Sequence, residues 1–394
     1  MDRPAELDKV SGAARLAAAW TTLFVIGTDL FVVSPMLPAI AADYSISTSA
    51  AGLSVAAFAF AYMLAAPCLG QLADRIGRRR ILVGCLAGFV FANALSAVAP
   101  TFAAFVLSRA LAGGMAAGVS PTVYALVSDG APTGRRATWL GIAVSGLLTA
   151  LSLGTPLGAL AADAFGWSGV FFALALAAAG LIWVSVVVWP AGAAPALEKQ
   201  AFSNPAALAP RLGLTVLWST SLYGMYTYLG VGLSDCGYTA EQLAQTIFLY
   251  GLGAILGNLA GGCLADRIGE RVAIGASLLG LCCGLLALRC ALETGPLVGP
   301  ALFLASAAAQ VFFPTQQAAL AAEFSARRAV VLALNNSALF LGISLGSVVG
   351  AQAVAYGGFA FDLLLCAGLA FAGWIVQSLV AARFAQPGPE TITG

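Results

Sequence analysis

The chain has 394 residues, of which 60% are hydrophobic and 9% charged, with a mean hydropathy of +0.94 and a formal net charge of +1. Such a composition carries more apolar surface than a soluble core could bury, so it excludes an ordinary soluble domain and indicates a membrane protein. The few basic residues are spread along the chain, and we expect no nucleic-acid partner. Long uninterrupted apolar runs favour transmembrane helices over the alternating strands of a barrel.

Twelve apolar spans follow one another with short connections. The longest connection, 190–211, is rich in proline and is predicted to be a cytoplasmic linker between a first half, 1–189, and a second half, 212–394. We therefore predict an all-α membrane protein with six helices in each of two pseudo-symmetric halves. The predicted spans are 16–42, 50–73, 81–99, 102–127, 137–162, 170–189, 212–233, 242–264, 272–292, 297–322, 329–355 and 359–382.

The basic residues predict the orientation. All the lysines and arginines except Arg109 and Arg289 fall in the terminal segments or at the ends of even-numbered spans, and the odd connections have essentially none. Positive residues stay on the cytoplasmic side, so we expect both termini in the cytoplasm of a bacterial-type inner membrane. Contacts with anionic lipid are expected along the same face.

The first span contains a carboxylate, Asp29, near its middle, roughly 20 Å from the outer end by helical rise. A buried charge at that depth costs about 2.5–3.5 kcal/mol on insertion scales, which argues for a role. A carboxyl group there could take up and release a proton. The alternative is a carboxylate permanently satisfied by a neighbouring cation or by Thr28.

A repeat joins the two halves. The segment GQLADRIGRRR at 70–80 recurs 192 positions later as GCLADRIGERV at 262–272, with eight of eleven residues identical. Self-similarity at half the chain length is typical of transporters that hold their substrate between two equivalent helical halves. Glycines bracket a tight inner turn and opposite charges lie at the helix end. The residues concerned are Gly70, Asp74, Arg75, Gly77 and Arg78, with Gly262, Asp266, Arg267 and Gly269 in the second copy.

Arg109, in the fourth span, is the second charge within a span, about 12 Å below the outer end. Its long side chain could reach toward the depth of Asp29 or extend outward to the lipid headgroups. Tyr124, Tyr223, Tyr226 and Gln310 are polar residues in otherwise apolar spans, and they either contact substrate or join neighbouring helices. In the fifth span, Gly154 and Gly158 form a small-x-x-x-small step and Pro156 can bend the helix.

These motifs resemble those of the major facilitator superfamily. The segment 70–80 is similar to the family signature between helices two and three, and Arg109 followed by Gly113 is similar to its helix-four pattern. The run 154–158 resembles the glycine-proline motif of the twelve-span drug:proton antiporter branch, from which it departs at Thr155 and Ala159. The resemblance implies helices one, four, seven and ten around a central cavity and a charged inner latch that closes when the site faces outward.

We therefore expect a secondary active transporter that exports a small amphiphilic or drug-like compound in exchange for protons, by alternating access. The alternative is transport of a polar metabolite such as a sugar or amino acid. The sequence contains no histidine, so the usual catalytic sets cannot be assembled and we expect no enzyme. We expect no metal or other cofactor, because the eight cysteines show no metal-ligand spacing. A scaffold or sensor is disfavoured because the spans leave no soluble output domain, and the protein is expected to be a monomer.

Overall fold

The computed structural model describes residues 11–132, 135–190, 205–324 and 328–385, and these residues form helices joined by short turns. The first half, or N half, contains α1 (Gly12–Phe31), α2 (Val33–Asp43), α3 (Thr48–Ala51), α4 (Leu53–Ile76), α5 (Arg78–Ala97), α6 (Phe102–Gly130), α7 (Arg136–Thr149), the π-helix η2 (Ala150–Gly154), α8 (Thr155–Phe165) and α9 (Trp167–Val188). The second half, or C half, contains α10 (Pro205–Asp235), α11 (Ala240–Ile268), α12 (Glu270–Ala291), α13 (Val298–Gln310), α14 (Phe312–Glu323) and α15 (Arg328–Ala385).

These helices correspond to the twelve predicted spans. Within the described residues, nine helices are long and apolar enough to cross a membrane, and the bent pair α1–α2 makes a tenth. α15 comprises two spans, because the backbone leaves the helical region at Gly357 and Gly358. α10 is the remaining span, with 31 residues. It begins at Pro205, ahead of the start predicted at 212, and most of the predicted linker, 191–204, lies outside the described residues.

The first span is bent rather than straight. α1 and α2 meet at an angle of 45° around Val32. Pro35 lies in the first turn of α2, where it has no backbone N–H to donate to the carbonyl of Phe31. The hydroxyl of Tyr226, from α10 in the other half, donates to that carbonyl at 3.3 Å. The proline therefore both bends the helix and frees an acceptor for a contact between the halves.

Other spans are interrupted by the same kinds of residue. The fifth passes through the π-turn η2 just before Pro156, and the tenth breaks between α13 and α14 ahead of Pro314. Gly358, at φ 70°, turns the chain from the eleventh span into the twelfth. Such breaks are tolerated because neighbouring helices satisfy the freed backbone groups.

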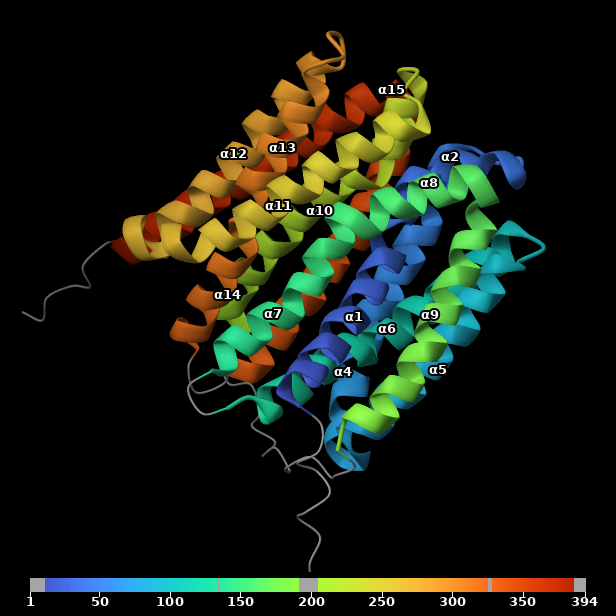
Figure 1. Ribbon diagram of the computed structural model, residues 1–394. Coiled ribbons are helices and arrows are strands. Elements are labelled where there is room, and N and C mark those ends of the chain that lie inside the picture. Colours follow the sequence, from blue (N-terminus) through green and yellow to red (C-terminus); the bar gives the residue numbers. More distant parts are fainter. Residues whose placement is uncertain (1–10, 133–134, 191–204, 325–327, 386–394) are drawn as a thin grey trace, which may run out of the picture.

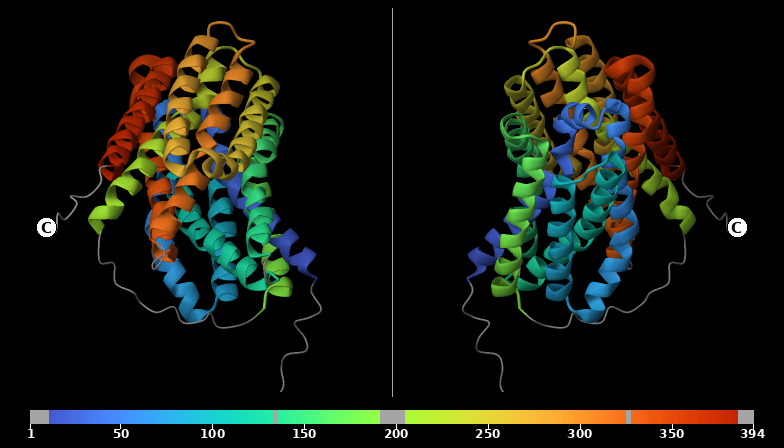
Figure 2. Two further views of the ribbon diagram at one scale, coloured as in Figure 1. Left: turned by 90° about the vertical axis from the view of Figure 1, so that its left-hand side faces the viewer. Right: turned by 90° about the vertical axis from the view of Figure 1, so that its right-hand side faces the viewer.

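The two halves lie side by side as similar groups of helices, the blue-to-green N half against the yellow-to-red C half (Figures 1 and 2). α2 packs on α10, α4 packs on the first part of α15, and α8 packs on α11 across the boundary. Ser34 and Tyr226 are 192 positions apart, and the Ser34 hydroxyl donates to the Tyr226 carbonyl. Contact between two equivalent positions indicates that the pseudo-twofold axis passes close to this point.

The two ends of the bundle differ in charge. Among the described residues, the arginines other than Arg109 and Arg289 lie at the end where α4 gives way to α5 and α11 to α12, which we call the basic end. At the opposite, far end the turns carry helix caps: Thr101 caps α6 and Thr239 forms a capping box with Gln242 on α11. Gly77 and Gly269 form the equivalent turns at the basic end, with φ of 100° and 84°.

Candidate functional site

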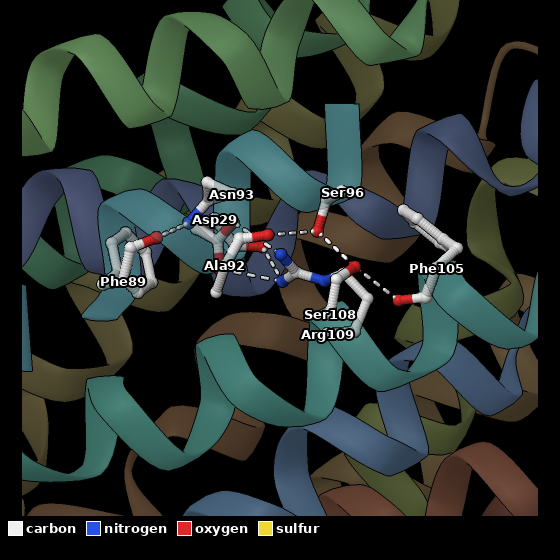
Figure 3. Close-up of polar contacts among 8 residues, drawn as sticks. All are labelled: Asp29, Phe89, Ala92, Asn93, Ser96, Phe105, Ser108 and Arg109. Carbon is white, nitrogen blue, oxygen red and sulfur yellow. Dashed lines mark hydrogen bonds and ion pairs between the residues drawn. The ribbon is translucent and has the colours of Figure 1, made fainter. Parts of the chain in front are cut away.

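The structure brings Asp29 and Arg109 together as a bidentate ion pair inside the N half (Figure 3). Arg109 Nη1 lies 2.9 Å from Asp29 Oδ1, and Nη2 lies 2.8 Å from Oδ2 and 3.3 Å from the Asp29 carbonyl oxygen. The side chains are 1% and 0% exposed, so Arg109 does not extend to the membrane surface. Two planar groups in this geometry form a strong, oriented contact that a lysine could not reproduce.

Two aromatic side chains pack against the guanidinium of Arg109. The Cζ atom of Arg109 lies 5.0 Å from the ring centroid of Phe58 on α4 and 4.9 Å from that of Phe171 on α9. The desolvated cation is attracted to the electron-rich ring faces. Nε of Arg109 has no hydrogen-bond partner among the described residues. The pair is therefore held by one carboxylate and two rings, and Asp29 is the main compensation for the buried positive charge.

A short chain of polar groups lies beside this ion pair, as Figure 3 shows. The hydroxyls of Ser96 on α5 and Ser108 on α6 are 2.8 Å apart, and Ser108 also donates to the Phe105 carbonyl at 2.6 Å. Asn93 donates to the Phe89 carbonyl at 3.1 Å, and its Oδ1 has no partner among the described residues. The contact between Ser96 and Ser108 joins α5 to α6 one residue before Arg109.

The residues that follow Asp29 in α1 and α2 lie at the interface between the two halves. We call the residues that line the small cavity at this interface the layer. A cavity of ≈ 10 Å³ remains there, about the space of one water molecule. The rings of Phe31 and Tyr223 stack at 6.2 Å, and those of Tyr226 and Tyr250 lie 5.0 Å apart. The lining is mostly apolar and aromatic with a few neutral hydroxyls: Leu30, Phe31, Ser34, Val55, Tyr223, Tyr226, Thr227 and Ile343.

The other polar residues singled out in the sequence divide between this layer and the helix contacts around it. Gln310, at the end of α13, is 5% exposed and its side chain faces the Tyr223 hydroxyl. Tyr124 does not line the cavity and lies instead close to Tyr62 within the N half. Tyr62, which the sequence reasoning passed over, stacks on Phe340 of α15 across the boundary. In the sequence, the only indication of this role was the presence of a tyrosine within an apolar span.

The halves are held together at the far end by hydrogen bonds to backbone carbonyls, which we call the far-end contact. Ser347 donates to the Gly52 carbonyl at 2.6 Å and Ser344 to the Ala56 carbonyl at 3.1 Å. The Tyr228 hydroxyl lies 2.8 Å from the Ser347 carbonyl and 3.4 Å from that of Ser49. A Cβ added at Gly52 would be 1.9 Å from this hydroxyl, so the close approach depends on glycine.

The two copies of the repeated motif at the basic end differ in their described contacts. Arg78 pairs with Asp129 of α6, whereas Arg75 is exposed. In the second copy Asp266, Arg267 and Gly269 are exposed. A Cβ at Gly70 or Gly262 would meet nothing within 4 Å, and Gly77 and Gly269 have the backbone conformation that glycine alone adopts readily. The side chain of Asp74 lies outside the described part of the chain.

The glycines of the fifth span pack against the first. A Cβ at Gly154 would be 2.1 Å from Thr28 Oγ1, and one at Gly158 would be 2.3 Å from Val32 Cγ2. Pro156 is in the first turn of α8, directly after η2. The step therefore lets α8 approach the two helices that carry Asp29 and the bend at Val32. Among the described residues, no group of three or more histidine, cysteine or carboxylate side chains could hold a metal ion.

One buried carboxylate escaped the sequence reasoning. Asp362, in the twelfth span, is 0% exposed and contacts Cys366, whose Sγ lies 3.6 Å from Oδ1. Its Oδ2 has no hydrogen-bond partner among the described residues. The signal was present, because Asp362 is the only acidic residue in the predicted span 359–382.

Sequence comparisons identify relatives over most of the chain. A 30% identical protein, the uncharacterized MFS-type transporter YceJ of Bacillus subtilis (strain 168), aligns over 85% of this chain and 88% of its own length. The inner membrane transport protein YdhP of Escherichia coli (strain K12) is 29% identical over 94% of this chain and 95% of its own. A chloramphenicol resistance protein of Streptomyces lividans is 27% identical over 61% of this chain and 64% of its own.

Solved structures share the fold. The D-xylose-proton symporter superimposes with a TM-score of 0.76 at 16% identity, covering 92% of this chain and 97% of the symporter. The profile of the Major Facilitator Superfamily matches residues 19–239 and 212–393. The helices of the twelve predicted spans, the two related halves and these relatives agree, and the protein is an integral membrane protein of the Major Facilitator Superfamily of transporters.

Proposed function

We propose that this transporter exports a small amphiphilic compound in exchange for protons, and that Asp29 carries the exchanged proton. The observation behind the proposal is the Asp29–Arg109 ion pair, which is fully buried one residue from the lining of the layer between the halves. A carboxylate in this position has two competing partners, Arg109 and a proton. Taking up a proton cancels its charge and leaves Arg109 without its anion, so protonation changes the electrostatics of the whole N-half site.

The character of the layer supports an amphiphilic substrate. The residues that line it offer aromatic faces and neutral hydroxyls, and the two charges nearby are occupied with each other. Apolar walls with a few placed polar groups suit a ligand that is itself largely apolar. The relative named as a chloramphenicol resistance protein is consistent with such a compound and with export.

We further propose that the basic end faces the cytoplasm, as the distribution of positive residues predicts. The far-end contact then closes the outer side, and the substrate enters from the basic end. In exchange transport the proton and the substrate occupy the site in turn, one moving inward while the other moves outward. The halves rock about the layer near Ser34 and Tyr226, where the pseudo-twofold axis passes.

The test uses purified full-length protein in proteoliposomes with chloramphenicol as the first probe, after a ligand-stability screen of related aromatic amphiphiles. An imposed pH gradient should drive chloramphenicol accumulation by the wild type. Asp29→Asn should fold and still exchange labelled for unlabelled chloramphenicol, but accumulation against a gradient should fall to the rate of empty liposomes, because an amide cannot titrate in this range.

The matched control is Asp163→Asn, which alters an exposed carboxylate of α8 and should retain wild-type accumulation. Full pH-driven accumulation by Asp29→Asn would show that the proton is carried elsewhere. Addition of an uncoupler separates the two parts of the proposal, since it should abolish wild-type accumulation and leave exchange unchanged.

A further inference from the structure

The C half contains an acidic group with an unusual environment for a membrane protein. Asp362 is completely buried, and no described cation lies within ion-pairing distance of it. One carboxyl oxygen has only the weakly donating thiol of Cys366 at 3.6 Å, and the other has no hydrogen-bond partner among the described residues. An ionised carboxylate without a counter-charge or donors is strongly disfavoured in such a place, so the surroundings favour the neutral carboxyl group.

The neighbouring helices add no compensating charge. On α10 the titratable group that faces Asp362 is Tyr228, and on α15 itself it is Cys366. α12, which also packs on α15, carries Glu270 and Arg271 at the basic end and Arg289 in an exposed pair with Glu293.

The remaining partners of α15 are equally remote. α4 carries Arg75, exposed at the basic end, and the ionised side chain of α14 is Glu323, which pairs with Arg211. α3 contains no ionisable residue. The described side chains therefore surround Asp362 with a phenol and a thiol.

Asp362 also lies directly behind the far-end contact. Gly350 leaves a space in the first part of α15, and a Cβ there would be 3.2 Å from Asp362 Oδ1 and 2.8 Å from Tyr228 Cε2. The carboxyl and the tyrosine ring thus meet over this glycine. The same tyrosine reaches the Ser347 carbonyl, and Ser347 donates to Gly52 of the N half. One side chain therefore separates Asp362 from the boundary between the halves.

The position of Asp362 along the twelfth span determines from which side of the membrane water could reach it. It lies three residues after Phe359, where the twelfth span starts at the far end. If α10 and α15 move away from α3 and α4, these two helices no longer cover Asp362 at the far end. Water could then solvate the carboxylate, which the closed arrangement does not allow.

We propose that Asp362 is a second proton-binding site, which holds its proton while the far-end contact is closed and releases it to water at the far end when the contact opens. The O–H bond of the carboxyl breaks, the proton passes to water, and the carboxylate remains. Because uptake and release occur on the same face, this proton regulates the opening and is not transported. The inference requires alternating access but is independent of the role proposed for Asp29.

The first measurement detects the proton itself. Infrared difference spectra of full-length protein in nanodiscs, recorded between acidic and alkaline pH, should contain the C=O band of a protonated carboxyl that disappears as the pH rises. Asp362→Asn should lack this band. Asp29→Asn should retain it whether or not it transports, so failure of the proton-exchange proposal and failure of this one give different results.

The second measurement follows the opening. Spin labels at Cys236 and at Ala42→Cys, both exposed at the far end, report the separation of the two halves. In wild type, the ratio of open to closed protein should rise with pH by up to about tenfold per pH unit, the slope for one proton. Asp362→Asn should stay closed throughout. The other exposed cysteines are first replaced by serine: Cys68, Cys263, Cys283 and Cys290.

Two variants complete the design. Asp235→Asn removes an exposed carboxylate at the same end and should leave the pH response unchanged. Asp362→Glu keeps a titratable group, and its response should persist with a shifted C=O band, which maintains the test if the asparagine variant does not fold. A pH response in Asp362→Asn equal to that of the wild type, or an unshifted band in Asp362→Glu, would overturn the proposal.

Discussion

The two halves share one arrangement of helices but bury different charges. In the N half, Asp29 and Arg109 form a bidentate pair between α1 and α6. At the positions 192 residues later stand Ser221 and Ala301, so the C half has neither charge. Ser221 donates instead to the Cys366 carbonyl at 2.7 Å. The repeat has thus preserved the apolar pattern that specifies the helices, while the buried charged groups have diverged.

The C half in turn contains side chains that the N half lacks at the equivalent positions. The position in the N half equivalent to Asp362 is Val170, and the position equivalent to Tyr226 is Ser34. The C half therefore supplies the larger aromatic side chains and an unpaired carboxyl group, and the N half supplies the ion pair. We infer an asymmetry in which the transported proton of the proposed function binds in the N half, at Asp29, although the two halves each supply four of the residues that line the layer. The following variants test this asymmetry.

Removing one partner of the ion pair should give the largest effect. Arg109→Ala leaves Asp29 buried without a counter-charge, and breaking a buried pair in this way costs about 3–5 kcal/mol. Thermal unfolding in detergent should show the loss. Arg289→Ala in the C half removes a partly exposed cation from its pair with the exposed Glu293 and should cost less than about 1 kcal/mol. Equal losses in the two variants would contradict the asymmetry.

The equivalent turns at the basic end offer a sharper comparison. Gly77→Ala and Gly269→Ala each place a Cβ on a backbone that favours glycine, so each should cost about 1–3 kcal/mol. Only Gly77 precedes an arginine that pairs with another helix, Arg78, whereas Glu270 occupies the second position. Initial transport rates should therefore fall more for Gly77→Ala. Identical rates in both variants would mean that the repeated turns serve only as connections.

The smallest expected effect concerns the contact between the halves. Tyr226→Phe removes the donor to the Phe31 carbonyl, a net loss of about 0.5–1.5 kcal/mol. The far-end distance measured between spin labels should shift toward the open form by up to about tenfold in population. Tyr238→Phe removes a bond to the Gly295 carbonyl within the C half and should leave the distance unchanged. An open population that does not differ between the two would rule out Tyr226 as a closing contact.

The sequence by itself determined the membrane class, the two halves and the approximate limits of the spans. Helices in lipid must be long and apolar, and this requirement acts on each segment separately, so it can be read without knowledge of the neighbours. The repeat at 70–80 and 262–272 located the equivalent turns for the same reason. Asp29 and Arg109 were recognisable as candidates because charged residues are rare in such spans.

Only the tertiary structure decided which of these groups meet. The bidentate geometry of Asp29 and Arg109, the two rings that cover the guanidinium and the isolation of Asp362 each depend on the rotation and depth of several helices. The Phe31 carbonyl, which Pro35 leaves without its helical donor, accepts a hydrogen bond from the hydroxyl of Tyr226, 195 positions later in the sequence. Hydropathy and spacing specify a helix but not the neighbour that each face will contact, because in lipid that choice follows from close packing and interhelical hydrogen bonds.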